Sequence, residues 1–243
     1  MSELKVKIFA DGAELDQIEE LASLPYIKGF TTNPTLMRNA GVSNYYEFAS
    51  QMLKLVPDYP VSFEVVSDEP EEIIKQAEEL ASWGDNVYVK IPVTTTKGEF
   101  LGPAMTKLSS AGVQLNVTAV FTERQVSGVL ECLTPRTPSV VSVFAGRLAD
   151  AGIDALPAMA RMTAMVHEHE NSEIIWASPR QIYNVVEAEK AGCDIITVSP
   201  GLLKKLPLLG KDLEEFSLDT VQMFYDDALS AGLTIEAKSK IEH

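Results

Sequence analysis

The chain has 243 residues, of which 46% are hydrophobic and 23% are charged, and its formal net charge is −15 at pH 7. This balance is typical of a globular protein, and the acidic surface argues against nucleic acid or anionic lipid as partners because it repels phosphate groups. No apolar run reaches the roughly 18 residues of a membrane helix, and the start of the sequence lacks a signal-peptide pattern, so we expect a cytosolic protein with no membrane partner.

Short apolar runs rich in β-branched residues alternate with longer amphipathic stretches, which indicates repeated βα units around a parallel sheet. The predicted strands span residues 5–10, 29–32, 61–66, 87–93, 114–120, 140–144, 173–177 and 194–198. The clearest helical patterns between them span residues 14–24, 70–83, 123–133 and 153–168. Eight units at short loop spacing predict an α/β fold consisting of one (β/α)8 TIM barrel.

An open, doubly wound sheet is built from the same βα units and has to be weighed against a barrel. The first predicted strand ends in Ala-Asp-Gly-Ala-Glu, and the sequence contains neither G-x-G-x-x-G nor G-x-x-x-x-G-K-[ST]. A dinucleotide-binding fold and a P-loop are therefore not supported. We favour the closed barrel and expect no bound cofactor.

Two further helical patterns, 202–206 and 218–231, follow the last predicted strand. The apolar residues of the second pattern recur at roughly the spacing of a helix with one buried stripe. They are Leu218, Val221, Met223, Phe224, Ala228 and Leu229. We expect this helix to pack across a barrel end or on another subunit. The predicted organisation is a catalytic barrel with a C-terminal helix over residues 1–233, followed by a charged, frayed tail over residues 234–243.

Polar side chains at the carboxyl ends of parallel barrel strands point into a common site. The predicted strands and the residues after them supply such side chains in chain order: Asp11, Thr31, Thr32, Asn33, Glu64, Lys90, Asn116, Thr118, Ser142, Arg147, Ser178 and Arg180. The sequence therefore predicts a catalytic site at this end of the barrel.

Lys90 lies in the apolar run Val-Tyr-Val-Lys-Ile-Pro, where burial disfavours its charged form. A neutral lysine attacks a ketone or aldehyde to form an imine, and the protonated imine withdraws electrons so that a carbon–carbon bond can break without a metal. The alternative is a lysine whose stem lies along the barrel wall and whose ammonium meets solvent or a carboxylate.

Asp11 and Glu64 favour the imine hypothesis because they bring two carboxylates to the same barrel mouth. One can move protons to and from a substrate hydroxyl, and the other can act directly or through a water held by Thr118. Each also has a simpler interpretation, Asp11 as a helix cap and Glu64 as the ion-pair partner of a neighbouring lysine.

Arg147, Ser178 and Arg180 follow consecutive predicted strands, so two guanidinium groups and a hydroxyl could meet on one anion such as a phosphate. The alternative is a pair of surface arginines that bind nearby acids such as Asp150.

Other residues do not indicate a site. His167 and His169 lie two positions apart on a predicted helix and do not share a face, so no metal site is expected. The sequence contains neither H-E-x-x-H nor G-x-S-x-G. We interpret Cys132, in a predicted helix, and Cys193, at a strand start, as buried thiols.

Six short motifs occur in a fixed order along the chain. They are Phe9-Ala10-Asp11, Gly29-Phe30-Thr31-Thr32-Asn33-Pro34, Val89-Lys90-Ile91-Pro92-Val93-Thr94, Asn116-Val117-Thr118-Ala119-Val120-Phe121, Phe144-Ala145-Gly146-Arg147 and Ala177-Ser178-Pro179-Arg180. Together they resemble the transaldolase family, in particular its short-chain branch, which also contains fructose-6-phosphate aldolases. The resemblance covers most of the chain.

The resemblance implies a role for each matching residue. Lys90 would form the Schiff base, with Asp11 and Glu64 as the acid/base pair and Thr118 holding a catalytic water. The implied substrate-binding residues are Thr32, Asn33, Asn116, Ser142 and Phe144, and the implied phosphate-binding residues are Arg147, Ser178 and Arg180. Two positions depart from the family pattern: Gly12 follows Asp11, and Pro179 separates Ser178 from Arg180, which affects the placement of Ser178.

The implied reaction moves a dihydroxyacetone unit from sedoheptulose 7-phosphate or fructose 6-phosphate to glyceraldehyde 3-phosphate or erythrose 4-phosphate. Glu64 and Phe144 favour a transaldolase, because the aldolases of this branch tend to carry Gln and Tyr there. The alternatives are an aldolase that releases free dihydroxyacetone and, from another class, a barrel that binds phosphosugars without turnover. The resemblance also implies a homo-oligomer.

Overall fold

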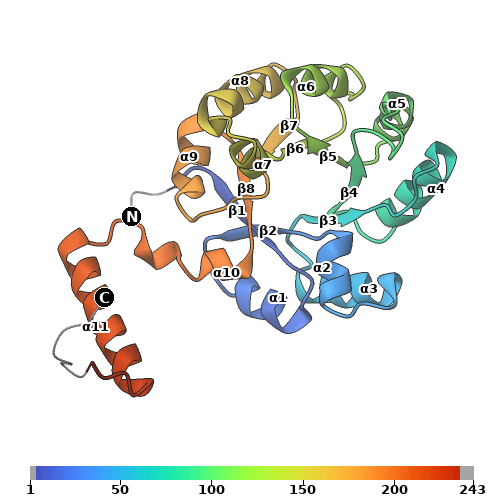
Figure 1. The fold of residues 1–243 in the computed structure, drawn as a ribbon. Coiled ribbons are helices and arrows are strands. Elements are labelled where there is room, and N and C mark those ends of the chain that lie inside the picture. The colour runs from blue at the N-terminus through green and yellow to red at the C-terminus, as the bar shows by residue number, and fades with distance from the viewer. Residues whose placement is uncertain (1–3, 236–243) are drawn as a thin grey trace, which may run out of the picture. The chain divides into compact units, whose positions relative to one another are not determined.

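The computed structural model describes residues 4–235, and eight parallel strands among them pair in chain order into a closed barrel in which β1 meets β8 (Figure 1). The strands are β1 (Lys7–Asp11), β2 (Ile27–Thr31), β3 (Val61–Glu64), β4 (Val87–Pro92), β5 (Leu115–Val120), β6 (Ser139–Val143), β7 (Ser172–Trp176) and β8 (Ile195–Val198). The predicted (β/α)8 barrel is confirmed, although most of the predicted strand bounds are displaced by one or two residues.

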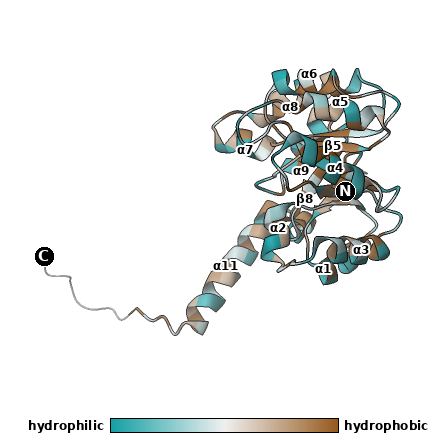
Figure 2. Cartoon of the chain, turned by 90° about the vertical axis from the view of Figure 1, so that its right-hand side faces the viewer, coloured by the Kyte–Doolittle hydropathy of each residue, from teal (hydrophilic) through white to brown (hydrophobic). Residues whose placement is uncertain are grey.

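Helices follow the strands and form the outer layer of the barrel (Figure 1). They are α1 (Leu15–Ala22), α2 (Pro34–Asn39), α3 (Tyr45–Leu55), α4 (Pro70–Ala81), α5 (Gly102–Ser110), α6 (Glu123–Leu130), α7 (Ala145–Asp150), α8 (Ala155–His167), α9 (Asn184–Ala191) and α10 (Pro200–Leu203). Many strand residues are hydrophobic and many outer helix positions are hydrophilic, as the colours of Figure 2 show. This is the pattern of a barrel that buries both faces of its sheet.

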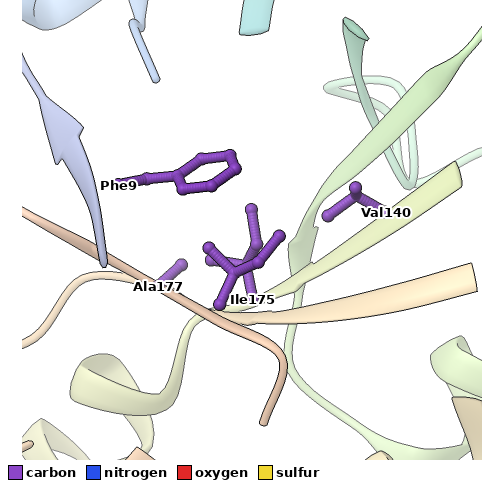
Figure 3. Packing of buried hydrophobic residues seen from close by; sticks show 5 residues of the cluster. Phe9, Val140, Ile175 and Ala177 are labelled. Atoms are coloured by element: carbon purple, nitrogen blue, oxygen red, sulfur yellow. The ribbon is translucent and has the colours of Figure 1, made fainter. Parts of the chain in front are cut away.

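The barrel interior is closed by side chains from several strands. Phe9, Val140, Ile175 and Ala177 point toward one another there (Figure 3), and Ile195 belongs to the same buried cluster. Gly29 lies against the ring of Phe9, and a Cβ at this position would come within 2.5 Å of a ring atom, so glycine lets the ring fit. The packed interior leaves the carboxyl ends of the strands as the place for a site.

Helix caps turn the chain sharply at the strand ends. The side chain of Asn33 accepts a hydrogen bond from Leu36 N at the start of α2, and Pro34 occupies the first helical turn. Thr122 and Gln125 form a reciprocal capping box at the start of α6. These turns keep the residues that follow the strand ends close to the barrel mouth.

The described residues divide into two compact units, one that ends at Lys205 and contains the barrel, and one that begins at Leu206. The second unit contains a short 3-10 helix, Leu206–Leu208, and α11 (Leu213–Ser230). No side chain of α11 is buried, and what covers the apolar stripe expected over residues 218–231 stays a prediction. The domain bounds stay a prediction, and residues 236–243 of the predicted tail lie outside the described residues.

The two cysteines differ in burial. Cys193 is buried as predicted, and burial raises the pKa of its thiol to about 11. Cys132 is only half-buried, which corrects the prediction, because α6 ends at Leu130 and Cys132 lies in the following turn. No helix between residues 4 and 235 is long and apolar enough to cross a membrane.

Candidate active site

A cavity of about 550 Å³ opens at the carboxyl ends of the barrel strands. Nine of the twelve predicted site residues line it: Asp11, Asn33, Glu64, Lys90, Thr118, Ser142, Phe144, Arg147 and Ser178. The side chains of Thr32, Asn116 and Arg180 are not part of this wall. The barrel therefore brings together most of the residues that the sequence indicates.

Lys90 extends from β4 and is 7% exposed. Its Nζ donates a hydrogen bond of 3.1 Å to the backbone oxygen of Thr32 and lies 3.3 Å from Oε2 of Glu64. Glu64 and Lys90 face each other because β3 and β4 pair them in register. This arrangement holds a buried amine next to a carboxylate at the floor of the cavity.

Asp11 and Glu64 are both carboxyl groups enclosed by the barrel. Burial raises the pKa of Asp11, opposed by the nearby Lys90 and by a 2.8 Å hydrogen bond from Thr31 Oγ1. Burial also raises the pKa of Glu64, and Lys90 again acts in the opposite direction. Raised carboxyl pKa values favour proton exchange nearer to neutral pH, as general acid–base groups require.

The hydroxyl of Thr31 links Asp11 to β8, because it also bonds to the hydroxyl of Thr197. Both threonines line the cavity, although the sequence analysis did not place Thr197 there or assign Thr31 a role. The sequence feature that indicates a cavity-facing Thr31 is its position two residues before Asn33, because alternate residues of an extended chain face the same side.

Thr32 faces away from the cavity for the same reason, and its hydroxyl donates to the backbone oxygen of Ser62. The predicted substrate contact by this side chain therefore has no support in the geometry. Thr32 acts on the site through its backbone oxygen, which accepts the hydrogen bond from Lys90.

Thr118 carries a buried hydroxyl that has no hydrogen-bond partner among the described residues. It lines the cavity next to Ala119, whose φ of 59° lies in the left-handed region that non-glycine residues rarely adopt. The β5–β6 register shifts between Val117 and Val120, so the strand is irregular at this point. An unpaired buried hydroxyl is costly unless a water or a ligand completes it.

Asn116 lies behind the cavity wall and joins two serines. Its amide nitrogen donates to Ser62 Oγ at 2.9 Å, and its amide oxygen accepts from Ser142 Oγ at 2.6 Å. Ser142 thus presents its oxygen lone pairs to the cavity. Asn33 uses its amide oxygen as the cap of α2, which leaves its amide nitrogen available as a donor.

Arg147 and Ser178 form the outer part of the wall. The Arg147 guanidinium lies 5.4 Å from the ring centre of Phe144, within the range of a cation–π contact. Ser178 has a φ of 60°, and a Cβ on Gly146 would lie 1.7 Å from its backbone oxygen. Gly146 is therefore required for the close approach of the two loops that carry Arg147 and Ser178.

Arg180 does not line the cavity, because its Nε and Nη2 atoms bind the carboxylate of Asp150. Both partners are about half-exposed. The alternative interpretation, a surface arginine paired with Asp150, thus describes Arg180, whereas Arg147 faces the cavity. The Nη1 atom of Arg180 takes no part in the bonds to Asp150.

Comparison with known proteins gives a consistent result. Residues 8–240 match the family described as Transaldolase/Fructose-6-phosphate aldolase. A "Probable transaldolase" of Dehalococcoides mccartyi is 34% identical over 218 residues, which cover 88% of this chain and 97% of that protein. Another "Probable transaldolase", from Thermoanaerobacter sp. strain X514, is 35% identical over 219 residues, or 88% of this chain and 96% of the relative.

Among solved structures, a "putative phosphonomutase" from Burkholderia cenocepacia J2315 has a similar fold, with a TM-score of 0.56. Its sequence is 11% identical, and the match covers 91% of this chain and 94% of that chain. At this identity the likeness concerns the barrel fold alone.

Proposed function

This chain belongs to the transaldolase/fructose-6-phosphate aldolase family, and we propose that it transfers a dihydroxyacetone unit from a ketose phosphate to an aldose phosphate through a Schiff base on Lys90. The observation that carries the proposal is the buried Lys90 amine, 3.3 Å from Glu64 in a cavity that also contains Asp11. Sedoheptulose 7-phosphate and fructose 6-phosphate are the proposed donors, and glyceraldehyde 3-phosphate and erythrose 4-phosphate the proposed acceptors.

The first half-reaction begins when neutral Lys90 adds to the C2 carbonyl of the ketose. The adduct loses water, and the resulting iminium draws electrons from the C3–C4 bond. Asp11 removes the proton of the C4 hydroxyl, the bond breaks, and its electron pair forms an enamine on Lys90. The aldose phosphate leaves with its new aldehyde.

The second half-reaction runs these steps in reverse with another aldose phosphate. The enamine carbon attacks the acceptor aldehyde, and Asp11 returns its proton to the new hydroxyl. Water then hydrolyses the iminium and frees Lys90. Glu64 and a water on the unpaired Thr118 hydroxyl exchange protons in the steps that add and remove water.

The substrate is oriented by polar groups at different heights in the cavity. Asn33 donates a hydrogen bond to one sugar hydroxyl, and Ser142 accepts a hydrogen bond from another. Arg147 and Ser178 bind the phosphate at the cavity mouth. Arg180 contributes less than Arg147 while it remains bound to Asp150, because the carboxylate offsets its charge.

Transfer is favoured over aldol release because of Glu64 and Phe144. The ring of Phe144 lies 5.6 Å from that of Phe121, and this apolar pair carries no hydroxyl that could deliver a proton to the enamine. The enamine therefore persists until the acceptor binds, whereas its protonation and hydrolysis would release free dihydroxyacetone.

We also propose a homo-oligomer, because α11 exposes apolar side chains that water does not stabilise. Val221, Phe224 and Leu229 are each more than 60% exposed. Light scattering coupled to size exclusion measures the subunit number. The cytosolic location remains a prediction from the sequence.

The experiment is a coupled assay of fructose 6-phosphate with and without erythrose 4-phosphate, on wild type and on Lys90→Ala. We expect continuous production of glyceraldehyde 3-phosphate only with the acceptor, and none from the variant. Equal production without acceptor would make the protein an aldolase, and an active Lys90→Ala variant would contradict the Schiff base.

A further inference from the structure

The backbone oxygen of Glu64, at the end of β3, lacks the partner that the sheet would normally supply. In the ladder between β2 and β3, Phe30 N donates to Pro60 O and Thr32 N donates to Ser62 O. Bonds of a parallel ladder recur every two residues, so the next donor toward Glu64 O would be the backbone nitrogen of residue 34. That residue is Pro34, which has no N–H.

Tyr45 supplies the missing donor. Its hydroxyl donates a 2.8 Å hydrogen bond to the backbone oxygen of Glu64, although Tyr45 belongs to α3. The ring is held edge-on by Phe63 and Trp83, at centroid distances of 6.2 and 5.8 Å. An aromatic clamp of this kind fixes where the hydroxyl points.

The end of β3 is not fixed by packing alone. Glu64 lines the catalytic cavity on one side and, on the other, an apolar cavity of about 330 Å³ bounded by Tyr45, Val65, Leu80 and Trp83. The neighbouring β4 holds this end through a bond from Val65 N to Lys90 O. Gln76 Oε1 accepts bonds from Val66 N and Ser67 N just beyond the strand, and the bond from Tyr45 adds an anchor at Glu64 itself, on the β2 side.

We propose that Tyr45 is a positioning residue that fixes the end of β3 and so sets the distance between the Glu64 carboxylate and the Lys90 amine. The inference rests on the proposed function, because it assigns Tyr45 to the proton transfers that Glu64 performs there. Tyr45 itself is absent from the wall of the catalytic cavity and acts only through Glu64.

The first test is Tyr45→Phe, which keeps the ring and removes the hydroxyl. We expect kcat to fall about 10-fold to 100-fold, since a small displacement of a reacting group has effects of this size. The KM of both sugar phosphates should stay within about twofold, because the binding contacts of Asn33, Ser142 and Arg147 are unchanged.

Tyr59→Phe is the matched control. The Tyr59 hydroxyl also donates to a backbone oxygen, that of Ala22 at 3.0 Å, and its ring also packs edge-on, against Phe30. Both variants should lower Tm by a similar amount, about 2–4 °C. Only Tyr45→Phe should lose kcat; equal kcat in the two variants would overturn the inference.

A double-mutant cycle tests whether Tyr45 acts through Glu64. In a Glu64→Gln background, adding Tyr45→Phe should leave kcat unchanged, because the group that Tyr45 positions is already gone. If Tyr45→Phe costs the same factor in both backgrounds, Tyr45 does not act through Glu64 and the inference fails.

Failure of the proposed function has a different result, namely no acceptor-dependent transfer by the wild type. In that case the positioning role is measured from the carboxyl titration of Glu64 by NMR, with Lys90 and Asp11 as the other groups that set its pKa. Tyr45→Phe should move this titration and Tyr59→Phe should not; identical titrations in both variants would overturn the inference.

Discussion

The candidate active site has two parts, one whose charged groups are largely enclosed by the barrel and one whose charged groups are exposed. The lysine half, formed by Asp11, Thr31, Glu64 and Lys90, consists of residues from strand ends whose polar atoms bond mainly to one another. The arginine half, formed by Arg147 and Ser178 with Arg180 outside the cavity wall, lies beyond the strand ends of β6 and β7. Its guanidinium groups are exposed, and Arg180 binds Asp150.

This difference fits the roles proposed for the two halves. Proton transfer and imine formation need groups held within a fraction of an ångström and shielded from water. A phosphate is a large, fully charged group that enters and leaves with each half-reaction, so exposed guanidinium groups can bind it without a large desolvation cost. Changes in the lysine half should therefore act on kcat, and changes in the arginine half on KM.

The largest effect is expected for Lys90→Met, which keeps the length of the side chain and removes the amine. Turnover should fall by about 1,000-fold or more, because no other group can carry the covalent intermediate. Steady-state rates with fructose 6-phosphate and erythrose 4-phosphate measure this. Lys107→Met, an exposed lysine of α5, is the control and should retain wild-type rates.

The next effect is expected for Asp11→Asn, which should lower kcat about 100-fold to 10,000-fold as a general acid–base group is lost. The same change should stabilise the fold. Burial raises the pKa of Asp11 above its ordinary 3.8, so ionising it in the folded state reduces stability as pH rises through the raised pKa.

Thermal unfolding across pH measures this second effect. Asp11→Asn should raise Tm by about 2–4 °C at pH 8, and the gain should vanish at a pH below the ordinary pKa of Asp11. Asp58→Asn, an exposed loop variant, should show no such pH-dependent gain. A gain that grows toward acid pH would mean that ionised Asp11 stabilises the fold.

In the arginine half, Arg147→Ala should raise KM for the sugar phosphates about 10-fold to 100-fold, the range of one or two charge-assisted hydrogen bonds. Arg180→Ala should raise it less, because Asp150 already occupies part of its guanidinium. Initial rates over a range of substrate concentrations separate KM from kcat. Arg161→Ala, on α8 and paired with Glu123, is the control; a larger effect at Arg180 than at Arg147 would reverse their assigned importance.

The smallest effect is expected for Asp150→Asn, which keeps the shape of the side chain and removes its charge. Released from this exposed pair, Arg180 should lower KM for phosphorylated substrates about twofold to fivefold. The same assay detects the change. An increase in KM would instead mean that Asp150 orients Arg180 toward the phosphate.

The sequence predicts the barrel and the lysine half well because both depend on local patterns. Lys90 stands out within an apolar strand, and Asp11 and Glu64 end strands that are recognisable from their β-branched residues. The resemblance implies a substrate contact for Thr32, whereas the alternation of side chains along the strand places the neighbouring Thr31 on the cavity side.

Other contacts depend on packing that no local pattern records. The sequence offers both a phosphate and Asp150 as partners of Arg180 and does not decide between them, and the bond from Tyr45 to Glu64 crosses from a helix to a strand. The helix α11 was predicted from its periodicity, but the same periodicity does not identify what covers its apolar side chains.

Trapping of the covalent intermediate tests the central claim, that Lys90 forms a Schiff base. The protein is incubated with fructose 6-phosphate and sodium borohydride, digested, and analysed by peptide mass spectrometry. We predict one reduced dihydroxyacetone adduct, on the peptide that carries Lys90, and none in Lys90→Met. Labelling of a different lysine, or no labelling of folded wild-type protein, would contradict it.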